Sequence, residues 1–565
     1  MRIPTIAVLT GPQPVDGDSV LRAELAAVGA TVIDADGPAA AARAVASASA
    51  AGRVALVDRR LVAHRHALRL AIEDPRWQAA HSTGVLTVSG PARELLATRL
   101  RTLPDLTAHR VEGGSPAARL TAPRPLVPDT LATQLAESLP IHEVKLPEGL
   151  VATLVDAPLS ARKDAYARVA ANDGEAIRLR KAVKSDDGLF ATLFVSSYSR
   201  YLARWCAQRG LTPNLVTTLS LLIAVVGALT ATTGTRAGYI GAAVALYLSF
   251  VLDCTDGQLA RYALNFSRIG SWLDATFDRA KEYAVYAGLA FGAARNGDDV
   301  WLLAALTMAL QTLRHHIDFA FHEAERSART QHEADDPPLS APAPTAPPAL
   351  KSPTYWARKI IVLPIGERWA LIALLTALTT PRTTFVALLI WGLIAAAYTT
   401  AGRVQRSLAR TAPRSPRAVA SLYAMSDILA RPRAEVSRLS TRLGWLVPPV
   451  YHAFDYAIPI AFATEVHGAL PLTFAYLAAV MYHHYDVVYR IRAHAAVPRW
   501  ITVAGLGTEG RIVLLVLANL LPTTPAHHGL LYAFGVLAVY LWVLFLGESV
   551  HFWVRPTATA LLPAD

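Results

Sequence analysis

The chain has 565 residues, of which 53% are hydrophobic, and a formal net charge of +11. This composition is too apolar for an ordinary soluble protein of such length, and the chain is too long for one domain. Excess positive charge attracts nucleic acid or anionic lipid. Because the apolar residues gather into membrane-length segments, we expect membrane lipid and no nucleic acid as the partner.

Short apolar runs alternate with helical patterns at the start of the chain, which predicts a soluble α/β domain over residues 1–150 with a mainly parallel sheet. His64 and His66, in the segment AHRHALRL, are expected on the basic surface of a helix rather than as metal ligands. The expected strands are residues 3–10, 31–34, 54–58 and 84–89, and the expected helices include 19–28 and 39–49.

Residues 151–210 are expected to link this domain to the membrane. Within them, residues 185–205 place apolar side chains at helical spacing and arginines on another face. That pattern is typical of an amphipathic helix at a membrane interface. The two cysteines, Cys206 and Cys254, cannot define a disulfide framework, so we expect a reduced cytosolic face.

Residues 211–402 are predicted to form a multi-pass membrane domain. Lys and Arg are concentrated in alternate connections between its apolar segments, and this bias marks the cytoplasmic side. We therefore expect a cell-membrane protein whose N-terminal domain is cytoplasmic. Residues 330–353 are rich in proline and alanine and are expected to form a disordered loop. The six segments, each near the length of a span, are residues 212–233, 238–256, 270–294, 299–318, 366–380 and 384–401.

Four aspartates lie within the second and third of these segments. Asp253 and Asp256 are three residues apart, and Asp274 and Asp278 are four apart, so each pair shares one face of a helix. Acidic residues at membrane depth are costly and usually mark function. Four converging carboxylates would form an oxygen-only site suited to Mg²⁺ or Mn²⁺, on the cytoplasmic side. The alternative is a set of aspartates paired with arginines in an inert bundle.

The chain continues with an expected basic cytosolic linker, residues 403–445, and a second apolar region, residues 446–565, whose function the sequence does not indicate. The second region contains four further apolar segments, at 446–464, 468–486, 511–522 and 529–548. It also contains histidines and aspartates that could form a metal or substrate site or could pack at an interface, namely His452, Asp455, His483, His484 and Asp486.

The aspartates belong to a longer pattern, D-x2-D-G-x2-A-R-x8-G-x3-D-x3-D, in which every fixed position is filled. This pattern resembles the signature of the CDP-alcohol phosphotransferase (CDP-alcohol phosphatidyltransferase) family of integral membrane enzymes, and the resemblance covers residues 185–402. It implies a six-helix bundle that transfers a substituted phosphate from a CDP-alcohol to a hydroxyl group and releases CMP. Homodimers are common in that family, so a homodimer is a possible assembly.

The resemblance also implies roles for individual residues. Asp253, Asp256 and Asp274 would bind two metal ions, and Asp278 would act as general base, with possible metal contact. The remaining expected nucleotide-binding residues are Gly257, Ala260, Arg261 and Gly270 in the signature, and Asn214 and Thr217 in the segment TPNLVTT, which could equally be only a helix start.

The N-terminal domain faintly resembles the nucleotidyltransferase domains that precede this membrane fold in some members of the family. Such domains carry a glycine-rich basic loop after the first strand. Here that loop reads TGPQPVDGDS, with two glycines and no Lys or Arg between the strand and Arg22. We therefore expect a domain that has lost nucleotidyl transfer or never had it.

The expected function is phosphatidyl transfer in phospholipid biosynthesis, with CDP-diacylglycerol as donor. The expected acceptor is a polar alcohol, with inositol phosphate or glycerol phosphate favoured. Two alternatives remain open at this point. The donor could be a water-soluble CDP-alcohol, or the protein could be a non-enzymatic transporter or scaffold that binds a cation.

Overall fold

A computed structural model describes eleven segments of the chain, residues 4–14, 16–49, 52–102, 127–147, 152–154, 159–184, 186–326, 352–409, 415–429, 438–520 and 528–555. The chain divides into two compact units. We call Met1–Ala182 with Arg261–Phe266 the head, and Val183–Ala260 with Ser267–Asp565 the helical unit.

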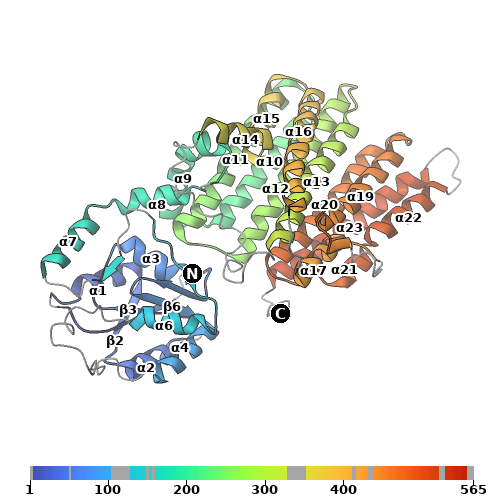
Figure 1. The fold of residues 1–565 in the computed structure, drawn as a ribbon. Coiled ribbons are helices and arrows are strands. Elements are labelled where there is room, and N and C mark those ends of the chain that lie inside the picture. Colours follow the sequence, from blue (N-terminus) through green and yellow to red (C-terminus); the bar gives the residue numbers. More distant parts are fainter. Residues whose placement is uncertain are drawn as a thin grey trace. The chain divides into compact units, whose positions relative to one another are not determined.

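The head contains a six-stranded sheet in the order β2-β1-β3-β6-β5-β7 (Figure 1). The four expected strands are present, and β1 pairs in parallel with both β2 and β3. The sheet is nevertheless mixed, because β6 runs antiparallel to β3 and β5. A two-residue turn joins β5 to β6 and forces that hairpin; its second residue, Gly84, has φ +71°. The strands are β1 (Thr5–Thr10), β2 (Ala30–Asp34), β3 (Arg53–Asp58), β4 (Leu61–Ala63), β5 (Ala79–Ser82), β6 (Val85–Ser89), β7 (His142–Glu143) and β8 (Ala152–Leu154).

Helices cover both faces of this sheet, which confirms the expected α/β layers. Apolar side chains of α1 and α3 pack on one face, and those of α2, α4 and α6 pack on the other. The expected basic surface at His66 is wrong, since His66 is buried, while His64 caps α3 by accepting a hydrogen bond from the His66 backbone at 3.0 Å. The helices are α1 (Ser19–Val28), α2 (Pro38–Ser47), α3 (Arg65–Glu73), α4 (Pro91–Thr102), α6 (Val127–Ala136), α7 (Leu159–Ala170) and α8 (Gly174–Ala182).

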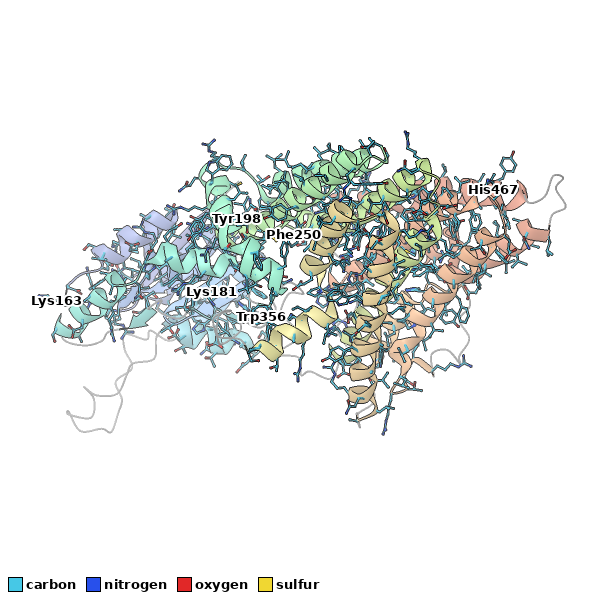
Figure 2. All side chains as sticks on the ribbon, turned by 90° about the horizontal axis from the view of Figure 1, so that it is seen from above. Lys163, Lys181, Tyr198, Phe250, Trp356 and His467 are labelled. Carbon is cyan, nitrogen blue, oxygen red and sulfur yellow. The ribbon has the colours of Figure 1, made fainter. Side chains whose placement is uncertain are left out.

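The helical unit begins with an amphipathic segment, a π-helical turn η1 (Phe190–Val195) followed by α9 (Ser196–Gln208). Tyr198 and Trp205 are exposed on one side, and Ala203 and Cys206 are buried on the other. The hydroxyl of Tyr198 lies 2.6 Å from that of Tyr247 on α11 (Arg236–Ala263), the helix that also carries Phe250 (Figure 2). The predicted amphipathic pattern is therefore present.

The six predicted membrane segments correspond to α10 to α13, α15 and α16. By length and composition, α10, α11 and α16 could each cross a membrane, and α14 with α15 could form one span bent by 67°. The helices are α10 (Pro213–Ala231), α11 (Arg236–Ala263), α12 (Arg268–Arg295), α13 (Trp301–Arg326), α14 (Pro353–Val362), α15 (Ile365–Leu378) and α16 (Pro381–Leu408). Most of the expected disordered loop lies outside the described residues, and its last residue, Pro353, begins α14.

The chain then forms a second group of helices, α17 to α23, which we call the tail. Its central helix, α20, is buried along most of its length and packs against α13, α19 and α23 (Figure 1). The expected linker 403–445 contains α17, whose Leu422 and Met425 pack in a core with α13 and α20. The tail comprises α17 (Pro416–Met425), η3 (Gly444–Leu446), α19 (Val447–Thr464), α20 (Ala469–Arg492), α21 (Arg499–Ala504), α22 (Gly507–Leu520) and α23 (His528–Val554). The spans α21–α22 and α23 are also long and apolar enough to cross a membrane.

Candidate active site

Three of the four signature aspartates converge where α11 ends and α12 begins. One ligand oxygen from each of Asp253, Asp256 and Asp274 lies within 4.8 Å of the others. The turn between the helices makes this possible, because Ser267 caps α12 by accepting a hydrogen bond from the Gly270 backbone at 2.9 Å. That cap starts α12 two turns before Asp274 and sets Asp274 opposite the end of α11.

The carboxylate of Asp256 is held by α10. Thr217 Oγ1 lies 2.5 Å from Asp256 Oδ2 and 3.0 Å from the carbonyl oxygen of Pro213. One turn further along, Ser220 and Ser249 exchange side-chain-to-backbone hydrogen bonds of 2.8 and 2.9 Å. These buried links fix α10 against α11 and place Thr217 within the aspartate cluster.

A lysine that the sequence analysis did not single out lies among the aspartates. The ammonium group of Lys281, on a fully buried side chain, contacts Asp253 Oδ1 and lies 3.2 Å from Asp278 Oδ1. It also donates to Ser220 Oγ at 3.1 Å and lies over the ring of Trp369. Lys281 follows Asp278 by three residues, so both side chains lie on one face of the helix. This spacing could have identified the lysine from the sequence.

Most of the other predicted site residues belong to the helical unit, whereas Arg261 belongs to the head. A Cβ atom at Gly270 would meet Asn214 Oδ1 at 2.7 Å, so glycine allows the start of α12 to approach the start of α10. Gly257 and Ala260 are half-buried on the last turns of α11. Arg261 differs, because its Nε donates to the carbonyl oxygen of Ala182, a residue of the head unit to which Arg261 also belongs.

The aspartate cluster suits a hard divalent cation. All its donors are carboxylate oxygens, which Mg²⁺ and Mn²⁺ prefer. Lys281 lies against Asp253 and Asp278, so these two carboxylates already accept a cation between them. Asp253, Asp256 and Asp274 are therefore the residues that would hold a metal.

A second polar layer fixes the other side of α12. Glu282 accepts a hydrogen bond from Arg368 Nη2 at 3.1 Å and one from the Tyr286 hydroxyl at 2.7 Å. Arg279, next to Asp278, lies 3.3 Å from Glu282 and 3.2 Å from His315 Nδ1 on α13. This layer ties α12 to α13 and α15 and so orients the helix that carries Asp274 and Asp278.

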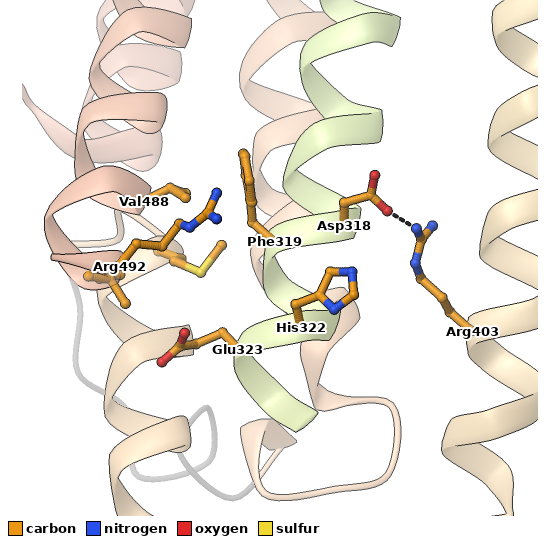
Figure 3. A pocket seen from close by; sticks show the side chains of 9 residues that line it. Asp318, Phe319, His322, Glu323, Arg403, Val488 and Arg492 are labelled. Carbon is orange, nitrogen blue, oxygen red and sulfur yellow. Dashed lines mark ion pairs between the residues drawn. The ribbon is translucent and has the colours of Figure 1, made fainter. Parts of the chain in front are cut away.

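A pocket of about 270 Å³ lies at the end of α13 (Figure 3). Asp318 and His322 turn towards Arg403 of α16, with which Asp318 forms an ion pair, whereas Phe319 and Glu323 turn towards α20. The guanidinium of Arg492 lies 5.3 Å from the centroid of the Phe319 ring. The lining is completed by Met425, Val488 and Ile491.

Four of the five polar residues singled out in the last apolar region form one buried network. Asp455 pairs with Arg511 at 2.5 Å, and His484 Nε2 lies 3.7 Å from Asp455. His452 stacks on His484, and His483 lies 3.4 Å from Asp427, which Arg511 also binds, at 2.8 Å. Asp486 instead joins Arg490, Ser549 and Trp553.

Within the described segments, ligand atoms of three or more His, Cys, Asp or Glu residues converge closely enough for a metal only at Asp253, Asp256 and Asp274. Arg511 occupies the space between the two tail carboxylates. The geometry therefore supports the packing interpretation of the tail cluster over the metal-site interpretation.

Comparison with known proteins agrees with this geometry. Residues 210–379 match the model of the CDP-alcohol phosphatidyltransferase family. Residues 366–563 match a family of unknown function, DUF5941. The two matches overlap at α15, so the second covers α16 and the tail.

Curated relatives match the same part of the chain. The phosphatidylinositol phosphate synthase of Mycolicibacterium smegmatis is 40% identical over 115 residues, 20% of this chain and 50% of the relative. That of Streptomyces avermitilis is 31% identical over 121 residues, 21% of this chain and 49% of the relative. The bifunctional IPC transferase and DIPP synthase of Aquifex aeolicus is 32% identical over 96 residues, 17% of this chain and 22% of the relative.

The chain thus spans about half the length of the first of these relatives. The matched residues include the complete signature from Asp253 to Asp278, which confirms the resemblance drawn from the sequence. Residues 210–379 therefore form a CDP-alcohol phosphatidyltransferase domain within this longer chain.

Proposed function

We propose that the helical unit transfers a phosphatidyl group from CDP-diacylglycerol to a hydroxyl of an inositol phosphate and releases CMP. The observation that carries this proposal is the convergence of Asp253, Asp256 and Asp274 beside Asp278, in a domain of the matching family. The acceptor class follows from relatives named phosphatidylinositol phosphate synthase. Glycerol phosphate is the second candidate acceptor.

Two divalent ions, Mg²⁺ or Mn²⁺, bound by Asp253, Asp256 and Asp274 would neutralise the donor pyrophosphate and stabilise the attacking and leaving oxygens. Thr217 orients Asp256 for this task through its 2.5 Å contact. Lys281 orients Asp253 and Asp278 from the opposite side. The site is thereby preorganised by a neutral donor on α10 and a cationic donor on α12.

In the reaction, Asp278 accepts the proton of the acceptor hydroxyl. The acceptor oxygen forms a bond to the β-phosphorus of the donor, and the bond between that phosphorus and the bridging oxygen of CMP breaks. The proton remains on the Asp278 carboxyl until it passes to solvent. Asp278 is suited to this role because it lies on the same face of α12 as Asp274 and outside the triad of converging oxygens.

We further propose that this face of the membrane domain is cytoplasmic and that the head does not transfer nucleotides. In open α/β sheets, ligands bind beyond the carboxyl ends of the strands. In the head that edge holds ion pairs: Arg22 and Arg59 bind Asp34 at 2.5 and 2.9 Å, and Arg60 binds Asp58 at 2.9 Å. The loop after β1 offers no lysine or arginine for a triphosphate.

The test is CMP release by the purified chain with CDP-diacylglycerol, Mg²⁺ or Mn²⁺, and a panel of alcohols. We expect release with inositol phosphate and none without a divalent ion. A water-soluble CDP-alcohol serves as competing donor. Absence of CMP release with every donor and acceptor would favour a cation-binding transporter or scaffold instead.

A further inference from the structure

The pocket at the end of α13 is built jointly by the two matched regions. Asp318, Phe319, His322 and Glu323 come from α13, inside the CDP-alcohol phosphatidyltransferase match. Arg403, Met425, Val488, Ile491 and Arg492 come from α16, α17 and α20, inside the match of unknown function. Neither region alone would form this pocket.

The pocket is linked to the helix that carries the proposed base through the rings of His315 and Tyr485. Arg279 directly follows Asp278, and its guanidinium lies 3.2 Å from His315 and 5.2 Å from the Tyr485 ring centroid. The rings of His315 and Tyr485 lie 6.3 and 6.4 Å from Phe319, which lines the pocket. One aromatic layer thus separates the Asp278 region from the α20 side of the pocket.

The lining has the chemistry of a site for a phosphorylated polyol. Arg403 is buried, and its Nε and Nη1 atoms make no hydrogen bond within the described segments, although Asp318 pairs with its other nitrogen. Buried guanidinium N–H groups favour phosphate oxygens as partners. Glu323 can accept hydrogen bonds from hydroxyl groups, and Phe319 holds the Arg492 guanidinium over its ring (Figure 3).

We propose that the tail forms one wall of the acceptor pocket and that Arg492 binds the acceptor phosphate. The proposal rests on the transfer reaction proposed above and names a specificity residue for it. Arg492 is carried by α20, whose position the tail fixes by packing α20 against α13, α19 and α23. The tail is then part of the enzyme and determines which alcohol is used.

The test compares Arg492→Gln with Arg499→Gln in the full chain. Arg499 is an exposed tail residue outside the pocket, so its variant controls for loss of tail charge. A charged hydrogen bond to phosphate contributes about 1.5–3 kcal/mol, or roughly tenfold or more in affinity. We expect Arg492→Gln to raise KM for inositol phosphate at least tenfold, with KM for CDP-diacylglycerol unchanged and Arg499→Gln like the wild type.

Two further measurements separate a specific role from a structural one. Arg492→Lys keeps the charge, and we expect it to recover part of the affinity for inositol phosphate. The KM for unphosphorylated inositol should be the same in Arg492→Gln and the wild type, because this acceptor has no phosphate for Arg492 to bind. An unchanged KM for inositol phosphate in a folded Arg492→Gln variant would overturn this inference while leaving the transferase intact. Absence of CMP release by the wild type would overturn the proposed function itself.

Discussion

Two carboxylate clusters of the helical unit, one at the signature and one in the tail, have different partners. At the signature, Asp253 of α11 and Asp278 of α12 share one ammonium group, that of Lys281, and Asp256 accepts a hydrogen bond from the Thr217 hydroxyl. In the tail, Asp427 and Asp455 share Arg511, whose remaining nitrogen donates to the carbonyl oxygen of Gly505.

The contrast is between carboxylates whose oxygens converge like metal ligands and carboxylates that share a guanidinium. A buried ion pair costs desolvation and contributes little net stability unless its hydrogen bonds are satisfied. In the tail, the Arg511 guanidinium donates to two carboxylates and a carbonyl. In the signature site, one oxygen from each of Asp253, Asp256 and Asp274 lies within 4.8 Å of the others, an arrangement that a divalent cation would bind. Acidic residues at membrane depth thus indicate a ligand site when their oxygens converge.

The largest effect should follow from removing a metal ligand. We expect Asp253→Ala, Asp256→Ala or Asp274→Ala to abolish CMP release, because each removes one of three converging oxygens. The measurement is turnover across a series of Mg²⁺ concentrations. Asp486→Asn, in the separate network with Arg490, is the matched control and should retain turnover. Near-normal activity of any of the three variants at low metal would remove that residue from the ligand set.

The next effect concerns Asp278. Asp278→Asn keeps the size of the side chain but cannot accept a proton, and loss of a general base typically costs about 10²–10⁴-fold in rate. We expect donor and metal affinity to change little while the single-turnover rate falls within that range. A normal rate with weakened metal binding would instead make Asp278 a ligand.

The third effect tests whether Arg511 balances the charge of the two tail carboxylates. Arg511→Met leaves Asp427 and Asp455 buried without a counter-charge, which should lower the free energy of unfolding by about 3–5 kcal/mol. Thermal unfolding of the full chain in detergent measures this loss. The triple variant with Asp427→Asn and Asp455→Asn removes all three charges and should recover most of the stability. An Arg511→Met variant as stable as the wild type would mean that another group compensates the carboxylates.

The sequence predicted local elements well and long-range pairing poorly. The bounds of α1 agree with the expected helix because α1 ends at Gly29, which adopts φ +93°. The β5–β6 hairpin was missed because AAHS is short and partly polar, so its strand character comes from pairing with β6. Helix α17 was missed because its surroundings are basic, and only its packing on α13 and α20 reveals its apolar face.

The same limit applies to the sites. The signature aspartates could be predicted because their spacing is local to two consecutive helices. Arg511 could not be paired with Asp427 from sequence, since 84 residues separate them. The pocket needed the same kind of information, because Arg492 and Phe319 meet only through the packing of α20 on α13. Sequence patterns therefore identify chemistry within an element or its neighbour, and tertiary packing decides the rest.

The smallest expected effect comes from the head, where a buried titratable group faces only like charges. Burial is the largest cause that lowers the pKa of His66 to about 4, and the neighbouring Arg69, Arg178 and His64 contribute to the same shift. The folded head therefore holds His66 neutral, whereas the unfolded chain protonates it below its ordinary pKa of about 6.5. Stability from this residue is complete above pH 6.5 and is lost as the pH falls from 6.5 towards 4, by at most about 3 kcal/mol.

This loss can be measured in the full chain by following a fluorinated Trp77 during thermal unfolding at pH 7 and at pH 4.5. We expect the midpoint of the head to fall at the lower pH, and His66→Gln to reduce that fall because glutamine does not titrate. His467→Gln, at the α19–α20 turn, is the matched control and should leave the pH dependence of the head unchanged. If the unfolding midpoint of the head had the same pH dependence in wild type and His66→Gln, protonation of another group would destabilise the head at low pH.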